Sequence, residues 1–296
     1  MGMKGQIKII LIIASMLIWG LSYPLVKILL DLGVPPIILA TLRHLVFIPM
    51  LVIFILRRSY QRYSVKDMRF FLSLAFFTIF LPNVTQNIGM MYTSASISSV
   101  IQSTSPVFTL ILAFIFLREK KTINKIMGSI LALLGTFFLS TGGRLCYNLS
   151  IFGNTLILVS SISYAISGVI LKKGLSRIPA FDLLCLETTF GFFMLLPVGL
   201  AFEGFDQLLN FNFEIWLYIL ILSLFASFIA AIIYYRVLLE EELSSLIMFT
   251  YLIPVFAIGF SYVLLEEVMS PNEILFTIII ILGVIISQLR SKTFGA

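Results

Sequence analysis

Long apolar stretches fill most of this chain, and short polar or charged breaks separate them. Ten such stretches can be read, each near the ~20 residues that a helix needs to cross the hydrocarbon core of a bilayer. They cover residues 8–30, 35–56, 69–91, 96–117, 123–141, 152–172, 182–202, 214–237, 244–265 and 272–290. Because a backbone in lipid must satisfy its own hydrogen bonds, each stretch is predicted to be helical.

The composition favours the same class of protein. Hydrophobic residues make up 60% of the 296 positions and charged residues 11%, whereas soluble domains carry about 25% charged residues. The first apolar stretch is too long for the apolar core of a removable signal peptide. Cys146 and Cys185 fall in different environments, and two cysteines are too few for a metal site. We therefore expect an all-α integral membrane protein that uses no metal or other cofactor.

The basic residues indicate an orientation. With the N-terminus in the cytoplasm, all but three of the 20 Lys and Arg residues fall on the cytoplasmic side or at that end of a span. Lys27 and Arg43 lie inside spans, and Arg144 lies outside the cell. The outer segments are acidic instead, with Asp31, Glu203, Asp206, Glu214, Glu266, Glu267 and Glu273. This asymmetry follows the positive-inside rule. It predicts cytoplasmic termini in a plasma-membrane protein, and it accounts for the net charge of +6 without a nucleic-acid partner.

Many residues recur at a fixed offset along the chain. Pro106 and Pro254 lie 148 positions apart, as do Gly20 and Gly168. The same offset links Ser15 with Ser163, Pro49 with Pro197, Glu119 with Glu267, Asn124 with Asn272, and Gly135 with Gly283. We therefore predict two halves of five helices each, residues 1–148 and 149–296. Because five is odd, equivalent helices cross in opposite directions, which makes the pair an inverted repeat suited to alternating access.

Several of these motifs resemble those of a known family. The run Trp19-Gly20-Leu21-Ser22-Tyr23, followed by Lys27, Pro36 and Arg43, is similar to the start of an EamA-type domain of the drug/metabolite transporter superfamily. Residues 92–135 resemble its fourth and fifth helices, and residues 244–283 repeat that pattern. The resemblance covers essentially the whole chain and implies a ten-helix carrier, often an exporter of amino acids or other metabolites. It departs from the family where Trp19-Gly20 becomes Ser167-Gly168 in the second half.

A stripe of amides is predicted to line a substrate cavity. Asn83, Gln86 and Asn87 have the spacing i, i+3, i+4 and therefore share one helix face. Polar groups inside a membrane cost free energy and tend to face the bundle interior. Hydrogen bonds that merely hold helices together are the alternative. Gln102 joins the predicted site just before Pro106. Because proline frees a backbone carbonyl, Pro106 and Pro254 are candidate hinges, with fixed kinks as an equal alternative.

Aromatic residues are predicted to complete the cavity. Trp19, Tyr23 and Lys27 share a face of the first helix at spacing i, i+4, i+8. Ordinary packing is the alternative for Trp19, and snorkelling to the outer interface is the alternative for Lys27. Tyr235 and Tyr251 offer hydroxyl groups from the second half and are included as substrate-binding candidates.

Lys27, Arg43 and Glu187 are the charged candidates within predicted spans, and His44 adjoins Arg43. Arg43 stays charged and needs a partner, such as a substrate carboxylate, an acid or a helix C-terminus. Glu187 is expected to pair with Arg236 or Lys172, and a protonatable role in coupling is the alternative. His44 is predicted to be a packing residue rather than a proton relay.

These features predict a secondary transporter that exports a small metabolite, such as an amino acid, by alternating access through a central cavity. Flipping of a lipid or lipid-linked precursor is the alternative. The chain has no phosphate-binding loop and no His-Glu-x-x-His motif, which argues against ATP-driven transport and against an intramembrane enzyme. The predicted partners are the small-molecule substrate and the lipid bilayer, and association into a homodimer is left open.

Overall fold

The computed structural model of the chain describes residues 5–92, 98, 101–141, 151–204, 206–265 and 271–289. Within these ranges the chain is helical and contains no strand, which confirms the predicted all-α class. Six helical segments are long and apolar enough to cross a membrane, and four shorter apolar helices accompany them in the described residues. The count of ten crossings therefore stays a prediction. Some predictions concern residues outside the described ranges, namely those for Arg144, Cys146, Glu266 and Glu267 and the boundary at residue 148.

The first predicted half contains helices at nearly the predicted positions. They are α1 (Gly5–Asp31), α2 (Pro36–Leu42), α3 (Phe47–Leu56), η1 (Ser59–Arg62), α4 (Val65–Ala75), η2 (Phe76–Phe80), α5 (Leu81–Tyr92), α7 (Ser105–Phe116) and α8 (Ile123–Thr141). The second predicted half contains α9 (Ile151–Leu175), α10 (Ala180–Phe202), η3 (Asp206–Asn210), α11 (Phe213–Ile221), η4 (Leu222–Ile229), α12 (Ala230–Glu240), α13 (Leu243–Leu246), η5 (Ile247–Tyr251), α14 (Leu252–Leu265) and α15 (Pro271–Gln288).

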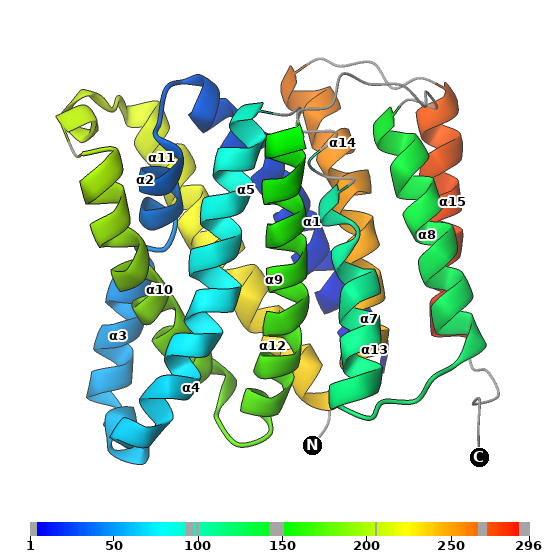
Figure 1. Cartoon of the computed structure of the whole chain (residues 1–296), viewed down its shortest axis with the longest axis horizontal. Coiled ribbons are helices and arrows are strands. Elements are labelled where there is room, and N and C mark those ends of the chain that lie inside the picture. Colours follow the sequence, from blue (N-terminus) through cyan, green and yellow to red (C-terminus); the bar gives the residue numbers. More distant parts are fainter. Residues whose placement is uncertain are drawn as a thin grey trace.

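The first helix of each predicted half packs against the other half. Helix α1 packs on α12 and α14, whereas α9 packs on α5 and α7. Helix α1 begins at the lower end of the bundle and α9 ends there, so the two run in opposite directions (Figure 1). An inverted repeat requires this arrangement, although the division into two repeats stays a prediction. Helices α8 and α15 pair at one edge, where a Cβ on Gly128 would lie only 2.5 Å from the carbonyl oxygen of Gly283.

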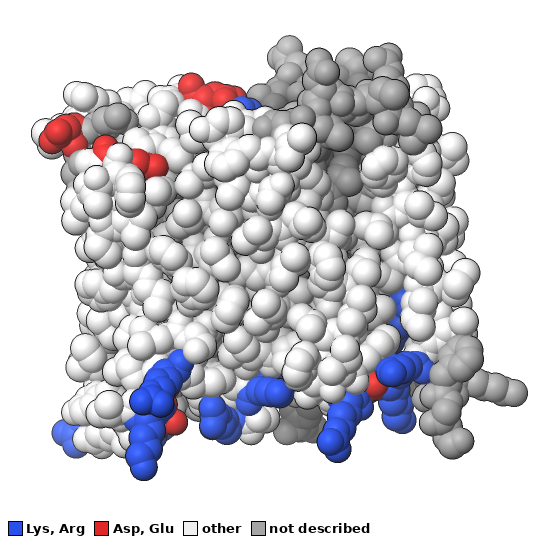
Figure 2. Space-filling view, in the orientation of Figure 1, with Lys and Arg blue, Asp and Glu red and all other residues white. Residues whose placement is uncertain are grey.

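The two ends of the bundle differ in charge. On the face shown in Figure 2, Lys and Arg side chains gather at the lower end and most Asp and Glu side chains at the upper end. Helix α1 begins and α15 ends at the basic end (Figure 1). The positive-inside rule would place this end in the cytoplasm.

Polar contacts tie the basic end together around the connection between α12 and α13. Lys8 of α1 forms ion pairs with Glu240 at 3.1 Å and Glu241 at 2.6 Å. Lys172 of α9 donates to the carbonyl oxygens of Leu238 and Glu241 at 2.6 and 2.7 Å. The Glu119 carboxylate accepts hydrogen bonds from the first backbone N–H groups of α13, at Leu243 and Ser244, both at 2.7 Å. These contacts hold α1, α9 and the segment after α7 to one connection.

A second contact anchors the loop between α3 and α4. The buried Asp182 carboxylate accepts hydrogen bonds from the Tyr63 hydroxyl at 2.8 Å and from Arg62 at 3.3 Å. Burial and the neighbouring carboxylate raise the pKa of the Tyr63 phenol, so this donor stays protonated. The loop is thereby fixed to the first turn of α10.

Candidate functional site

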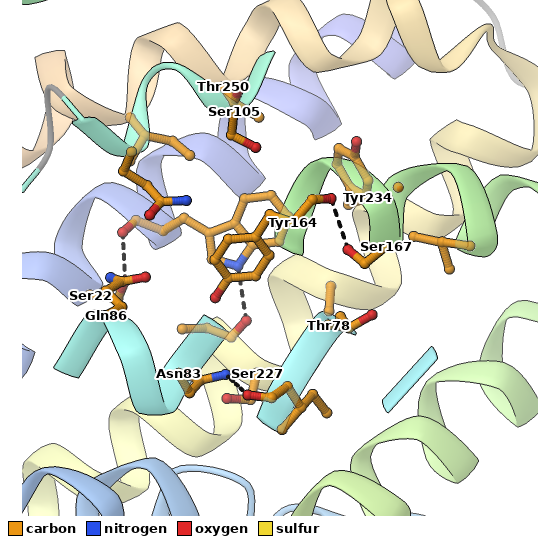
Figure 3. A pocket seen from close by; sticks show the side chains of 18 of the residues that line it. Ser22, Thr78, Asn83, Gln86, Ser105, Tyr164, Ser167, Ser227, Tyr234 and Thr250 are labelled. Carbon is orange, nitrogen blue, oxygen red and sulfur yellow. Dashed lines mark hydrogen bonds between the residues drawn. The ribbon is translucent and has the colours of Figure 1, made fainter. Parts of the chain in front are cut away.

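A cavity of about 260 Å³ lies between helices of the two predicted halves. Its walls come from α1, from the turn between α2 and α3, and from η2, α5, α7, α9, α10, η4, α12, η5 and α14. Figure 3 shows polar side chains of several of these elements directed into the cavity, with the Tyr164 ring in the middle of the view. The volume lies just below the ~300–1,000 Å³ of pockets for drug-sized ligands, so it suits a smaller metabolite.

A tight turn between α2 and α3 places Arg43 in the cavity. Helix α2 ends at Leu42 and α3 begins at Phe47, and hydrogen bonds of the tighter i to i−3 kind link His44 to Thr41 and Phe47 to His44. The backbone N–H of Val46 donates to the Ser223 hydroxyl at 2.9 Å, although the two residues are 177 positions apart. A side chain of the other predicted half therefore satisfies a backbone N–H group of this turn.

Two π-helical turns also line the cavity. The segment η2 contributes Thr78 and Ile79, and η4 contributes Ala226 and Ser227. The Trp19 indole N–H donates to the Ala226 carbonyl oxygen at 3.0 Å. The Ser163 hydroxyl donates to the carbonyl oxygen of Phe77 in η2 at 2.8 Å. Each π turn thus receives a hydrogen bond from the first helix of the other predicted half, and π turns are frequent at functional sites.

Most predicted site residues meet in this cavity. The lining includes Trp19, Tyr23, Arg43, Asn83, Gln86, Gln102, Pro106, Glu187, Tyr235 and Pro254. The Trp19 ring also packs against the Tyr234 ring, with centroids 5.3 Å apart. Gln86 forms a side-chain hydrogen bond with Tyr23, whereas the Asn83 amide donates back to the Ile79 carbonyl oxygen at 2.7 Å.

Three predicted site residues lie elsewhere. The side-chain amide of Asn87 donates to the Pro36 carbonyl oxygen at 2.9 Å and is 1% exposed, so it joins α5 to α2. The fully buried Tyr251 shares a hydrogen bond with Ser129 at 3.0 Å and joins η5 to α8. Lys27 pairs with Asp31, one turn further along α1, at 2.8 Å. None of the three belongs to the cavity lining that the structure describes.

The prediction that Glu187 forms an ion pair with Arg236 or Lys172 is wrong. One Glu187 oxygen accepts a hydrogen bond from Tyr235, and the other is buried without a partner. Lys172 binds backbone carbonyls instead, and Arg236 is exposed. The predicted ion pair does not form because Tyr235, rather than a cation, faces the carboxyl group from α12. His44 is buried with its Nδ1 atom 2.8 Å from the Ala40 carbonyl oxygen, yet it also lines the cavity.

Both prolines lie in the first turn of a helix rather than in its interior. Pro106 follows Ser105 at the start of α7, and Pro254 lies in the first turn of α14, after the 3₁₀ turn of η5. At the start of α7, Pro106 removes an N–H of the first turn, where helical partners are missing in any case. Pro254 differs, because α14 follows η5 without a gap, so its missing N–H falls within a continuous run of helical turns. Whether either site acts as a hinge stays a prediction.

The 148-residue offset identifies lining residues that were not among the predicted site residues. Adding it to Asn83, Gln86 and Gln102 gives Ala231, Tyr234 and Thr250, and all three line the cavity. Adding it to Trp19 and Tyr23 gives Ser167 and Leu171, which also line it. The offset was thus the signal that could have found the second wall of the site.

Comparisons with known proteins agree with this architecture. The pattern that describes the EamA-like transporter family matches residues 6–141 and again residues 151–289. An "uncharacterized transporter YvbV" of Bacillus subtilis is 27% identical over 276 residues, which cover 93% of this chain and 90% of that protein. An "uncharacterized transporter" of Archaeoglobus fulgidus is 28% identical over 282 residues, which cover 94% and 98% of the two chains. A solved crystal structure shares the fold with a TM-score of 0.79 at 14% identity, covering 96% of this chain and 97% of that one.

Proposed function

The chain belongs to the EamA-like transporter family, and we propose that it exports a small amphipathic metabolite, such as an amino acid, by alternating access. It is a multi-pass plasma-membrane transporter of small molecules and not an enzyme. The proposal goes beyond this assignment in three respects: the solute, the direction of transport and the mechanism.

The observation that carries the proposal is the mixed lining of the cavity. Amides from Asn83, Gln86 and Gln102 face rings from Trp19 and Tyr164 across one space. Such a lining suits a solute with a polar end and an apolar body, because hydrogen-bonding groups fix orientation and rings supply contact area. The walls come from helices of both predicted halves, so relative motion of the halves would open the cavity to one side and then to the other.

The contacts at the basic end support a gate there. Glu119, Lys8 and Lys172 hold the α12–α13 connection against neighbouring helices, and each contact is electrostatic or hydrogen-bonded rather than apolar. Contacts of this kind can break and reform as a carrier changes state, because water replaces each lost partner.

Exchange in proteoliposomes tests the proposal. Vesicles loaded with unlabelled amino acids should take up labelled amino acid through the wild-type protein, and Trp19→Ala and Gln86→Leu should reduce the initial rate at least several-fold. Asn87→Leu is the matched control, because Asn87 is an amide one residue from Gln86 but lies outside the cavity lining. Equal losses in Gln86→Leu and a folded Asn87→Leu protein would remove the cavity assignment.

A further inference from the structure

Arg43 and Glu187, two ionisable groups that line the cavity, differ in how accessible they are to a ligand. Arg43 is partly exposed within the cavity lining, and its buried Nε atom has no hydrogen-bond partner. The ion pairs of the described residues do not include it. Its electrostatic neighbours are the phenol groups of Tyr23 and Tyr164. A guanidinium group stays charged, so this cation faces the cavity without a carboxylate beside it.

Glu187, in contrast, is closed off from a ligand. The residue is 2% exposed, one carboxyl oxygen is bound to the Tyr235 hydroxyl, and the other is buried without a partner. A substrate ammonium group has no open oxygen to bind there. An ionised carboxylate with a buried, unpaired oxygen is costly, whereas a protonated carboxyl group is far less so. The site can therefore store a proton but offers little to a bound cation.

The titratable groups around Glu187 can be named for the part of the chain that the structure describes. The elements packed on α10 are α2, α3, α4, η2, α9 and α12, and α2, α3 and η2 carry no titratable side chain. Exposed or otherwise bound groups of α4, α9, α10 and α12 are Lys66, Asp67, Arg69, Lys172, Lys173, Asp182, Arg236 and Glu240. The groups that share the cavity with Glu187 are Arg43, His44, Tyr23, Tyr164, Tyr234 and Tyr235. Cys185 is a buried thiol on the same helix.

Charge balance links the two groups. In a space of low dielectric constant, the fixed charge of Arg43 needs a counter-charge. Among the described lining residues only Glu187 carries a carboxyl group, so in the empty cavity it is the group that would supply this counter-charge, at the cost of being ionised while buried and without an ion pair to Arg43. A bound anion at Arg43 would supply the counter-charge directly, and Glu187 could then become neutral by taking a proton from water.

We propose that the transported solute is a small organic monoanion whose carboxylate binds Arg43, and that its binding is accompanied by uptake of one proton at Glu187. The inference rests on the proposed transport function, and it replaces the zwitterionic amino acid named there with a solute that carries one net negative charge. A planar carboxylate fits the guanidinium fork, and the rings of Trp19, Tyr164 and Tyr234 would receive the apolar body. One net negative charge matches Arg43, the one fixed cation among the described lining residues, whereas a phosphate ester would bring a second charge without a partner there.

Calorimetric titration of the purified protein with phenylacetate, phenylacetamide, L-phenylalanine and phenyl phosphate tests this proposal. These probes share a ring and differ in charge. Titration in buffers of different ionisation enthalpy gives the number of protons bound. Phenylacetate should bind with uptake of one proton, so its affinity should rise about tenfold for each unit by which the pH falls within the coupled range. The other three probes should bind at least about tenfold more weakly, since each lacks the matching net charge.

Two variants and a control separate the roles. Arg43→Gln should weaken phenylacetate binding roughly 10- to 100-fold, the range for loss of a charged hydrogen bond. Glu187→Gln, which keeps the shape of a protonated acid, should bind phenylacetate with no proton uptake and a flat pH profile. Arg236→Gln removes an equal charge from the surface and should change neither the affinity nor the proton count.

The outcomes distinguish this inference from the transport function on which it rests. Binding of phenylacetate without proton uptake, tighter binding of phenylalanine or phenyl phosphate, unchanged affinity in Arg43→Gln, or no binding of any carboxylate overturns the inference. If proteoliposomes exchange a neutral or zwitterionic solute in that case, the transporter assignment stands alone. If they exchange none of the amino acids or carboxylates tested, the proposed function fails as well.

Discussion

The second apolar stretch of each predicted half takes a different form. Residues 36–56 form two helices with a tight turn at Arg43, whereas residues 180–202 form the single helix α10. The 148-residue offset pairs Arg43 with Gly191 and Glu187 with Leu39. From this stretch the first half brings Arg43 and the neighbouring His44 into the cavity and the second half brings Glu187, so the ionisable groups stand at non-equivalent positions. The predicted repeat thus accounts for where the helices lie, whereas the chemistry of the cavity comes from positions at which the two halves differ.

Different contacts maintain the two forms. Helix α10 stays continuous past Gly191, where the missing side chain makes room for Ile79 of η2. The turn after α2 is open at the same level, and Ser223 satisfies its freed N–H group. Each form thus depends on a residue in another element, and each dependence can be tested.

The largest effect is expected at Gly191. A Cβ there would lie 2.5 Å from Cγ2 and 2.7 Å from Cβ of Ile79, which is branched close to its backbone and cannot swing away. Gly191→Ala should lower the free energy of unfolding by about 3 kcal/mol, the upper end of the range for overpacking. Thermal unfolding in one detergent measures this. Gly199→Ala on the same helix is the control, because the nearest atom to its Cβ would be the flexible end of Ile38, at 3.2 Å, and its contacts with Ile37 and Thr41, at 3.6 and 3.7 Å, are ordinary. Equal melting temperatures for the two variants would show that α10 is not packed this tightly.

A smaller effect is expected at Ser223. Ser223→Ala would leave the buried Val46 N–H group without its acceptor, at a cost of about 2 kcal/mol. The matched variant is Thr189→Val, because the Thr189 hydroxyl donates to the carbonyl oxygen of Cys185 within a regular helix. That loss should cost less than about 1 kcal/mol, since the carbonyl keeps its helical partner. If the two variants melt alike, the turn at Arg43 does not depend on the second half.

The smallest effect is expected where the two stretches meet at the acidic end. The Glu203 carboxylate, directly after α10, accepts hydrogen bonds from the Ile37 and Ile38 N–H groups at the start of α2, at 3.0 and 2.8 Å. Glu203→Gln should cost about 0.5–1 kcal/mol, because a negative charge stabilises a helix N-terminus. The loss should shrink as salt is added, and Asp206→Asn, an exposed neighbour, should show neither effect. A salt-independent loss would mean that the contact acts through shape rather than charge.

Much of the fold could be predicted because apolar length and charge asymmetry are properties of the sequence alone. The predicted stretch 152–172 and helix α9 at Ile151–Leu175, for example, differ by at most three residues at either end. The turn at Arg43 could not be predicted, since its stabilising partner is Ser223 and no local pattern marks that contact.

Helical periodicity also misplaced part of the site. It put Asn83, Gln86 and Asn87 on one face, and the structure sends Asn87 to Pro36 instead. A face about 100° wide touches more than one neighbour, so a shared face does not mean a shared cavity. The same reason applies to Tyr251, because its hydroxyl shares a hydrogen bond with Ser129 on α8 instead.

The π turns of η2 and η4 set the rotation of the helices that follow them. A π turn takes up one extra residue within a single wide turn, whereas in an α-helix each residue advances the next by about 100°. A substitution that drove Phe76–Phe80 into regular α-helical geometry at unchanged length would no longer absorb that residue. Every residue from Leu81 to Tyr92 would then rotate by roughly a quarter turn relative to α4. Asn83 and Gln86 would leave the cavity together, although neither had been altered.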